Sequence, residues 1–289
     1  MTSGTLATKG DEVEEWLDLR FFRPIGIRLA RALAPTRISP DQVTMWSLAT
    51  GLVAGHLLFY PSVEINAIGW LLFIISDIFD SVDGQLARLR GTSTPLGRML
   101  DGLSDSARFI NLYAHLAARL IVFAKWPVVG AIALALAALL SHTWQAAAVD
   151  FIRHAFLAMT DQRSELELPE DLQTGSLGAW FYGGWVRRQA GMFPRTVALE
   201  RARRQGTLSA AARERYLTRA APLLGRCMWL GQNVRWLLVL LTVVPGWPAA
   251  MLWITVLPLN LVLFVFVWDA EHMEGQSWER SGHVSNRPD

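Results

Sequence analysis

Long apolar stretches alternate with polar segments along this chain. Six stretches approach the ~20 residues that a helix needs to cross a bilayer. They cover residues 41–60, 65–79, 99–123, 127–149, 228–244 and 248–268. The second continues as helix towards Leu89, and the fifth is the shortest of the later ones. This pattern predicts an all-α integral membrane protein with six transmembrane helices.

The segment before the first stretch has a different pattern. Residues 12–34 alternate apolar and charged side chains at helical spacing and end at Ala34-Pro35. The apolar positions are Trp16, Leu19, Phe22, Ile25, Ile27, Leu29 and Leu33. This spacing predicts an N-terminal amphipathic helix lying in the membrane interface. The alternative is a helix packed on a soluble domain.

Two further polar segments complete the predicted organisation. Residues 160–226 contain several glycines and many arginines, and we interpret them as a cytoplasmic insert. Residues 269–289 are predicted to form a disordered tail. The domains are thus a cytoplasmic N-terminal segment (1–38), a six-span domain (39–268) that includes the insert, and the tail.

The distribution of arginine predicts the orientation. Arginines are frequent before the first span, between the second and third, and above all between the fourth and fifth. The loops on the opposite side are short, and Lys125 is their only basic residue. Since cytoplasmic loops carry the excess of positive charge, both termini are expected in the cytoplasm.

Composition agrees with a membrane protein. Hydrophobic residues make up 52% of the chain and charged residues 18%, whereas soluble domains average ~25% charged. The net charge of +2 gives no indication of a nucleic-acid partner.

A group of acidic and small residues follows the second apolar stretch. It reads Asp80-x-x-Asp83-Gly84-x-x-Ala87-Arg88, then eight residues, then Gly97-x-x-x-Asp101-x-x-x-Asp105. At a usage of roughly 5% per residue type, these eight positions would coincide by chance in about one chain in 10⁸. The pattern therefore indicates a function, and acids near lipid are usually functional.

The spacing of the acids predicts a metal site. Residues three or four apart share a helix face, so Asp80 pairs with Asp83 and Asp101 with Asp105. Two helices joined by a short loop are neighbours, and the pairs can face each other. Four close carboxylates repel unless cations lie between them, and oxygen ligands suit Mg²⁺ or Mn²⁺. We expect two such ions, with the small residues leaving space for a substrate.

This segment resembles the hallmark motif of the CDP-alcohol phosphotransferase (CDP-alcohol phosphatidyltransferase) family. The strict match covers residues 80–105, and the six-span layout extends it. The sequence Ser39-Pro40-Asp41-Gln42-Val43-Thr44 also resembles the family's short motif at the start of the first span.

The resemblance implies roles for individual residues. Asp80, Asp83 and Asp101 would hold the metal ions, and Asp105 would act as the catalytic general base with a further metal contact. The nucleotide would be bound by Pro40, Thr44, Gly84, Ala87, Arg88 and Gly97. A homodimer is also implied.

Three arginines are candidates for binding phosphate or the acceptor. Arg153 follows the fourth span, where family members often carry an arginine, and the alternative is an ordinary positive-inside anchor. Arg108 lies three residues after Asp105, where it would bridge an acid or hold phosphate. Arg235 lies at the start of the fifth span.

The predicted reaction is transfer of a phosphatidyl-type group from CDP-diacylglycerol to a small polar alcohol, with release of CMP. Inositol phosphate, glycerol phosphate, inositol and serine are candidate acceptors. The modest length resembles the prokaryotic enzymes, which implies a multi-pass inner-membrane protein with a cytoplasmic active site. The first alternative is transfer of a phospho-alcohol from a soluble CDP-alcohol to a lipid hydroxyl. The second is a non-catalytic membrane binding or transport protein.

Overall fold

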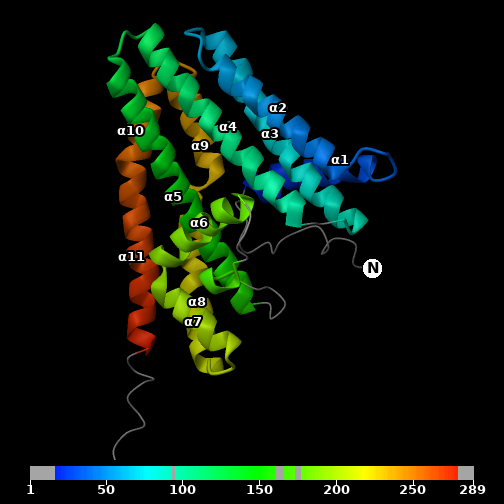
Figure 1. The fold of residues 1–289 in the computed structure, drawn as a ribbon, viewed down its shortest axis with the longest axis vertical. Coiled ribbons are helices and arrows are strands. Elements are labelled where there is room, and N and C mark those ends of the chain that lie inside the picture. Colours follow the sequence, from blue (N-terminus) through cyan, green and yellow to red (C-terminus); the bar gives the residue numbers. More distant parts are fainter. Residues whose placement is uncertain (1–16, 93–94, 161–165, 173–176, 279–289) are drawn as a thin grey trace, which may run out of the picture. The chain divides into compact units, whose positions relative to one another are not determined.

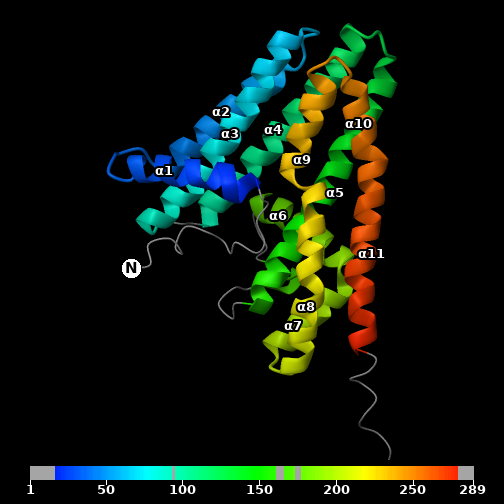
Figure 2. The ribbon, with the colours of Figure 1, turned by 180° about the vertical axis from the view of Figure 1, so that it is seen from behind.

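The computed structural model describes residues 17–92, 95–160, 166–172 and 177–278. Every regular element in these ranges is a helix, which confirms the predicted all-α class. The chain divides into two compact units, residues 1–142 with 232–258 and residues 143–231 with 259–289. Both units appear from opposite sides in Figures 1 and 2.

The first unit is built around three long helices that lie side by side (Figure 1). They are α2 (Pro40–Leu57), α3 (Val63–Arg90) and α4 (Pro95–Val122). The N-terminal η2 (Asp18–Phe22) and α1 (Arg23–Leu33) pack against α3. The start of α5 (Val128–Thr160), then α9 (Gln232–Leu238), η5 (Val239–Val243) and α10 (Pro248–Val256) complete the unit.

Local sequence signals explain where these helices begin and end. At the start of α2, Ser39 and Gln42 form a reciprocal capping box, and Pro40 occupies the first turn, where its missing N–H costs nothing. At the end of α3, Gly91 adopts φ +65°, a left-handed conformation that favours glycine. The core of the unit includes Phe73, Leu112 and Trp236.

Arg90 fixes the link between α1 and α2. Its guanidinium donates to the backbone oxygens of Leu33 (2.7 Å), Thr36 (2.9 Å) and Ile38 (2.6 Å), and also to that of Ala34. These oxygens lie at the end of α1 and in the turn that precedes α2. A single planar side chain thus orders the approach to the first turn of α2.

The second unit contains the predicted insert, whose described residues are mainly helical. It consists of the remainder of α5, η3 (Pro169–Asp171), α6 (Leu177–Met192), α7 (Pro194–Arg204), α8 (Ala210–Cys227), η4 (Met228–Leu230) and α11 (Pro258–Trp278). Phe151 of α5 stacks on Phe193 with ring centroids 5.0 Å apart. The fully buried Glu200 accepts hydrogen bonds from Arg203 and Arg204.

Ion pairs between elements also stabilise the second unit. Arg204 bonds both oxygens of Asp171, and this interaction holds the pKa of Asp171 below its usual value. Glu271 of α11 accepts from the backbone N–H of Arg195 at 3.0 Å. The arginines of the insert therefore bond to acids within the unit, in addition to any contact with membrane lipid.

Three segments among the described residues are long and apolar enough to cross a membrane, which is consistent with an integral membrane protein. They are Val63–Arg90, Val128–Thr160 and Pro248–His272. Helix α11 continues to Trp278, so residues 269–278 of the predicted disordered tail are helical. Residues 12–16 of the predicted amphipathic helix and residues 279–289 of the tail lie outside the described ranges.

We predict that Arg90→Met loosens the link between α1 and α2. Losing the guanidinium should cost about 1–3 kcal/mol of local stability, or roughly 5- to 150-fold faster amide hydrogen exchange in residues 33–38. Exchange measured by mass spectrometry provides the test. Arg28→Met, which changes an exposed arginine of α1, is the matched control. Equal exchange rates in the two variants would contradict the assigned role of Arg90.

Candidate active site

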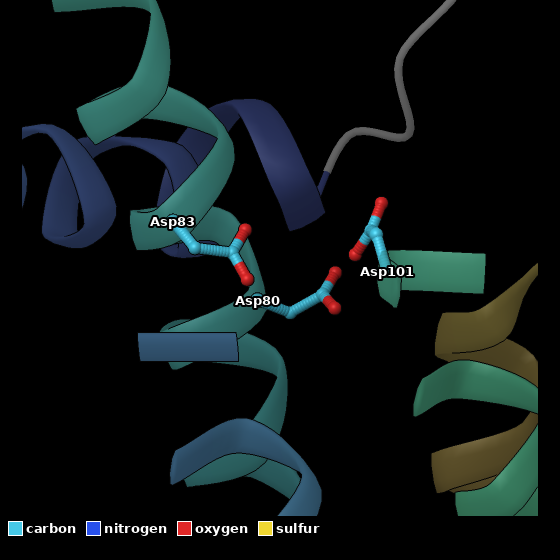
Figure 3. Close-up of side chains that lie close together, drawn as sticks. All are labelled: Asp80, Asp83 and Asp101. Carbon is cyan, nitrogen blue, oxygen red and sulfur yellow. The ribbon is translucent and has the colours of Figure 1, made fainter. Parts of the chain in front are cut away.

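Helices α3 and α4 bring three of the predicted acids together. Asp80 and Asp83 lie in the C-terminal part of α3, and Asp101 lies near the start of α4. One carboxylate oxygen from each residue lies within 4.8 Å of the other two. Figure 3 shows the Asp80 carboxylate between those of Asp83 and Asp101, with all three turned towards a common space.

The three acids differ in exposure and together fit a divalent cation. Asp83 is buried, Asp80 is half-buried and Asp101 is exposed, so the group extends from the helix interface to the surface. All its donors are hard oxygen atoms, the ligand type of Mg²⁺ and Mn²⁺. A cation between them would offset the repulsion of three close negative charges.

Thr44 connects the start of α2 to this group. Its hydroxyl donates to Asp83 Oδ2 at 2.5 Å and lies 3.2 Å from the Pro40 backbone oxygen. The sequence predicted a nucleotide-binding role for Thr44. The structure shows in addition that its hydroxyl orients one of the acids.

Asp105 lies outside the group of three, one helical turn beyond Asp101. Its Oδ1 accepts a hydrogen bond from Arg108 Nη2. Arg108 also forms ion pairs with Asp80 at 3.2 Å and with Asp77 at 3.1 Å. The sequence left open whether Arg108 bridges an acid or holds phosphate. Its contacts in the structure are ion pairs with acids.

Asp77 and its partners on α9 are not among the site residues predicted from the sequence. Asp77 Oδ1 accepts from Gln232 Nε2 at 2.7 Å, and its Oδ2 accepts from Trp236 Nε1. Two sequence features could have identified Asp77. It lies three residues before Asp80, on the same helix face, and it is an acid within a predicted span.

The remaining predicted nucleotide- and phosphate-binding residues lie on α3, α4, α9 and α5. Gly84 lies beneath the Arg88 guanidinium, since a Cβ there would be 3.5 Å from Arg88 Nη1. Ala87 and Gly97 are half-buried on α3 and α4. Arg235 is fully buried on α9 of the first unit. Arg153 is half-buried on the part of α5 that belongs to the second unit.

Comparison with known proteins agrees with this site. Residues 37–160, from just before α2 to the end of α5, match the family model described as CDP-alcohol phosphatidyltransferase. Over residues 37–160 the chain is therefore similar to this family, which confirms for this part the resemblance predicted from the motif. The match includes all four motif acids, Thr44 and Arg108, but not α9.

Several curated proteins are similar over part of their length. Phosphatidylinositol phosphate synthase of Mycobacterium tuberculosis (strain ATCC 25618 / H37Rv) is 35% identical over 95 residues, which cover 32% of this chain and 43% of that protein. A bifunctional IPC transferase and DIPP synthase of Rubrobacter xylanophilus is 35% identical over 122 residues (40% and 26%). CDP-diacylglycerol–serine O-phosphatidyltransferase of Methanocaldococcus jannaschii is 39% identical over 69 residues (24% and 29%). The chain spans less than half the length of each relative.

We predict that Thr44→Val weakens metal binding although Thr44 is not itself one of the three acids. The substitution removes the hydroxyl that orients Asp83, and losing such a supporting group typically costs ~10–100-fold in metal affinity. Mn²⁺ titration of the purified protein, followed by electron paramagnetic resonance, measures the change. Thr44→Ser retains the hydroxyl and should bind Mn²⁺ within about threefold of the unaltered protein. Equal affinities for the Val and Ser variants would show that the hydroxyl has no such role.

Proposed function

We propose that this protein is an integral membrane enzyme that transfers a phosphatidyl-type group from CDP-diacylglycerol to a small polar alcohol and releases CMP. The convergence of Asp80, Asp83 and Asp101 within a CDP-alcohol phosphatidyltransferase domain is the observation that carries the proposal. The names of the similar proteins support transfer to inositol phosphate or serine as candidate acceptor chemistry.

Asp80, Asp83 and Asp101 would hold two Mg²⁺ or Mn²⁺ ions, with Asp105 as a further metal contact. When bound, such ions neutralise pyrophosphate charge and stabilise the leaving CMP. The chain's own residues orient the reactants. Thr44 fixes Asp83, while Pro40, Gly84, Ala87, Arg88 and Gly97 line the nucleotide position.

Asp105 would accept the proton of the acceptor hydroxyl. Its side chain is 39% exposed, so an alcohol can reach it from the surface. Arg108 engages Oδ1, and we assign Oδ2 to the hydroxyl. A carboxylate held in this way is a fixed base, which would act on an acceptor hydroxyl bound within hydrogen-bond reach of Oδ2. Arg153 and Arg235 remain candidates for binding a phosphate of the acceptor or donor.

We further propose six membrane spans with both termini in the cytoplasm. The spans would be α2, α3, α4, α5, the α9–η5 segment and the α10–α11 segment. The described part of the N-terminal segment, η2 and α1, would lie in the membrane interface. The arginine-rich ends of α3 and α4 and the helical insert would be cytoplasmic, as the arginine asymmetry indicates. A homodimer in a prokaryotic inner membrane completes this proposal.

The catalytic prediction is that the purified protein releases CMP from CDP-diacylglycerol in the presence of Mg²⁺ or Mn²⁺ and a suitable alcohol. Asp105→Asn keeps the shape of the side chain but removes its basicity, so turnover should fall ~10²–10⁴-fold. Donor binding should change much less, because the three clustered acids remain. Asp83→Asn is the comparison, since it should weaken metal and nucleotide binding together.

The choice of substrates in the same assay distinguishes the alternatives. Acceptors to compare are inositol phosphate, glycerol phosphate, inositol and serine. CMP release only from CDP-choline or CDP-inositol would indicate that a soluble CDP-alcohol is the donor. No release from any CDP donor would reject the enzyme in favour of a binding or transport protein. Near-normal turnover of Asp105→Asn would reject its role as the base.

The topology prediction concerns four positions. Reporter fusions at Ser62, Lys125 and Gly246 should report the external side, and a fusion at Gly206 should report the cytoplasm. The reason is the excess of arginine on the side of Gly206. The inverse pattern would contradict the proposed orientation, and a mixed pattern at the three external positions would contradict six spans.

A further inference from the structure

A buried ion pair lies beside the three clustered acids. Asp77 is one turn before Asp80 on α3, and Arg108 is one turn after Asp105 on α4. The side chain of Arg108 is 1% exposed and that of Asp77 is 10% exposed. A buried charge is costly unless it is paired and hydrogen-bonded, so the pair depends on the partners of its two Nη atoms and of the Asp77 oxygens.

The two Nη atoms of Arg108 donate to different groups of residues. Its Nη1 donates to Asp77 Oδ1 at 3.1 Å and to Ser76 Oγ at 2.7 Å. Its Nη2 donates to Asp80 Oδ1 at 3.2 Å and to Asp105 Oδ1. Because the guanidinium is a planar fork with fixed donor directions, holding Nη1 at Asp77 also fixes Nη2 at the two acids of the site.

Asp77 is in turn held by α9. Its two oxygens accept from Arg108, from Gln232 Nε2 and from Trp236 Nε1. It does not belong to the group of three acids. The protein itself therefore supplies the donors of this carboxylate, and Arg108 is one of them.

Trp236 is fixed by its own contacts. Its ring stacks on Phe73 with centroids 4.5 Å apart and on Phe109 with centroids 5.6 Å apart. Its backbone oxygen accepts from Trp70 Nε1 at 2.9 Å. These contacts with α3 and α4 determine the direction of the indole N–H, which points at Asp77.

Gly51 on α2 makes room for the stem of Arg108. A Cβ at Gly51 would lie 2.4 Å from Arg108 Cδ and 2.7 Å from Cγ. These atoms are in the middle of the side chain and cannot move without moving the guanidinium. The space left by this glycine is thus a requirement for the position of Arg108.

We propose that Asp77 and Arg108 form a positioning unit, anchored by Gln232 and Trp236, that holds the carboxylates of Asp80 and Asp105 in their working orientation. This inference rests on the proposed function, because it gives the two carboxylates the roles stated there. It assigns to α9, which lies outside the matched residues 37–160, a part in shaping the site. Groups that orient ligating carboxylates typically affect metal affinity 10–100-fold.

Arg108→Lys is the first test, because it keeps the charge and removes the fork. Mn²⁺ affinity, measured by electron paramagnetic resonance on the protein without substrate, should fall about tenfold or more. The turnover number for CMP release should fall ~10²-fold, the effect of a misplaced catalytic group. Arg119→Lys is the matched control on the same helix, since Arg119 is also buried but donates to the backbone oxygens of Leu58 and Val243. It should leave Mn²⁺ affinity unchanged.

Gly51→Ala and Trp236→Phe test the two supports of Arg108 without altering any charge. The first displaces the stem, and the second removes the N–H that holds Asp77 while retaining an aromatic ring. Each substitution should lower Mn²⁺ affinity, as Arg108→Lys does. Trp253→Phe, which changes an exposed tryptophan of α10, is the control for Trp236→Phe.

A double variant tests whether these residues act through one another. If Trp236 acts through Arg108, then Trp236→Phe combined with Arg108→Lys should bind Mn²⁺ no more weakly than Arg108→Lys alone, because residues in one network are not additive. If the losses of Mn²⁺ affinity in the two single variants added fully in the double variant, Trp236 would not act through Arg108.

Two outcomes separate this inference from the proposed function. A folded Arg108→Lys protein that binds Mn²⁺ as tightly as the unaltered protein overturns the positioning unit, whatever its turnover. Failure of the unaltered protein to release CMP from any donor rejects the proposed function, and the Mn²⁺ titrations still decide whether Arg108 orients the acids.

Discussion

Carboxylates repel one another, and a few turns of α3 and α4 carry five of them. These are Asp77, Asp80, Asp83, Asp101 and Asp105. Placing five such groups so close together is costly unless positive charge or hydrogen-bond donors offset the repulsion and the loss of water. Arg108 supplies the positive charge for three of them, and Thr44 supplies a donor for Asp83. The group formed by Asp80, Asp83 and Asp101 has the oxygen ligands that suit a divalent cation.

Close packing of α2 against α3 and α4 makes this arrangement possible. Ser47 and Ser76 exchange hydrogen bonds between α2 and α3, with Oγ-to-backbone-oxygen distances of 2.8 and 2.7 Å. Gly51 admits the stem of Arg108, and a Cβ at Gly55 would lie 2.0 Å from Asn111 Oδ1. Small residues along α2 thus let polar groups of the neighbouring helices approach its backbone. The capping box at Ser39 and the contacts of Arg90 fix where that helix begins.

The second unit is stabilised differently from the first. Its described helices are connected by ion pairs such as Arg201 with Glu170 and Arg204 with Asp171, and by a fully buried Glu200 that accepts from two arginines. The match to the family model ends at residue 160, so α6, α7 and α8 lie outside the matched residues. Several arginines of these helices pair with acids of the same unit, and these acids offset part of the positive charge of the insert.

Helical periodicity by itself determined much of this protein. The three-residue spacing of Asp80 and Asp83 is enough to put both on one face of a helix, and the short connection to Asp101 is enough to bring that acid beside them. The apolar stretches likewise located α2, α3 and α4 to within a few residues, including the continuation of α3 towards Leu89, whereas α5 continues beyond its apolar stretch to Thr160.

Only the tertiary structure decided what surrounds those acids. Spacing puts Asp105 on the same face as Asp101, yet Asp105 bonds to Arg108 and lies outside the group of three. Gln232 and Trp236 are 155 and 159 residues from Asp77, and no local pattern relates positions so far apart. Their meeting depends on how α9 packs against α3. The sequence therefore determined which acids lie close together on neighbouring helices. Long-range packing decided which side chains contact them, because side-chain orientation depends on contacts that periodicity does not encode.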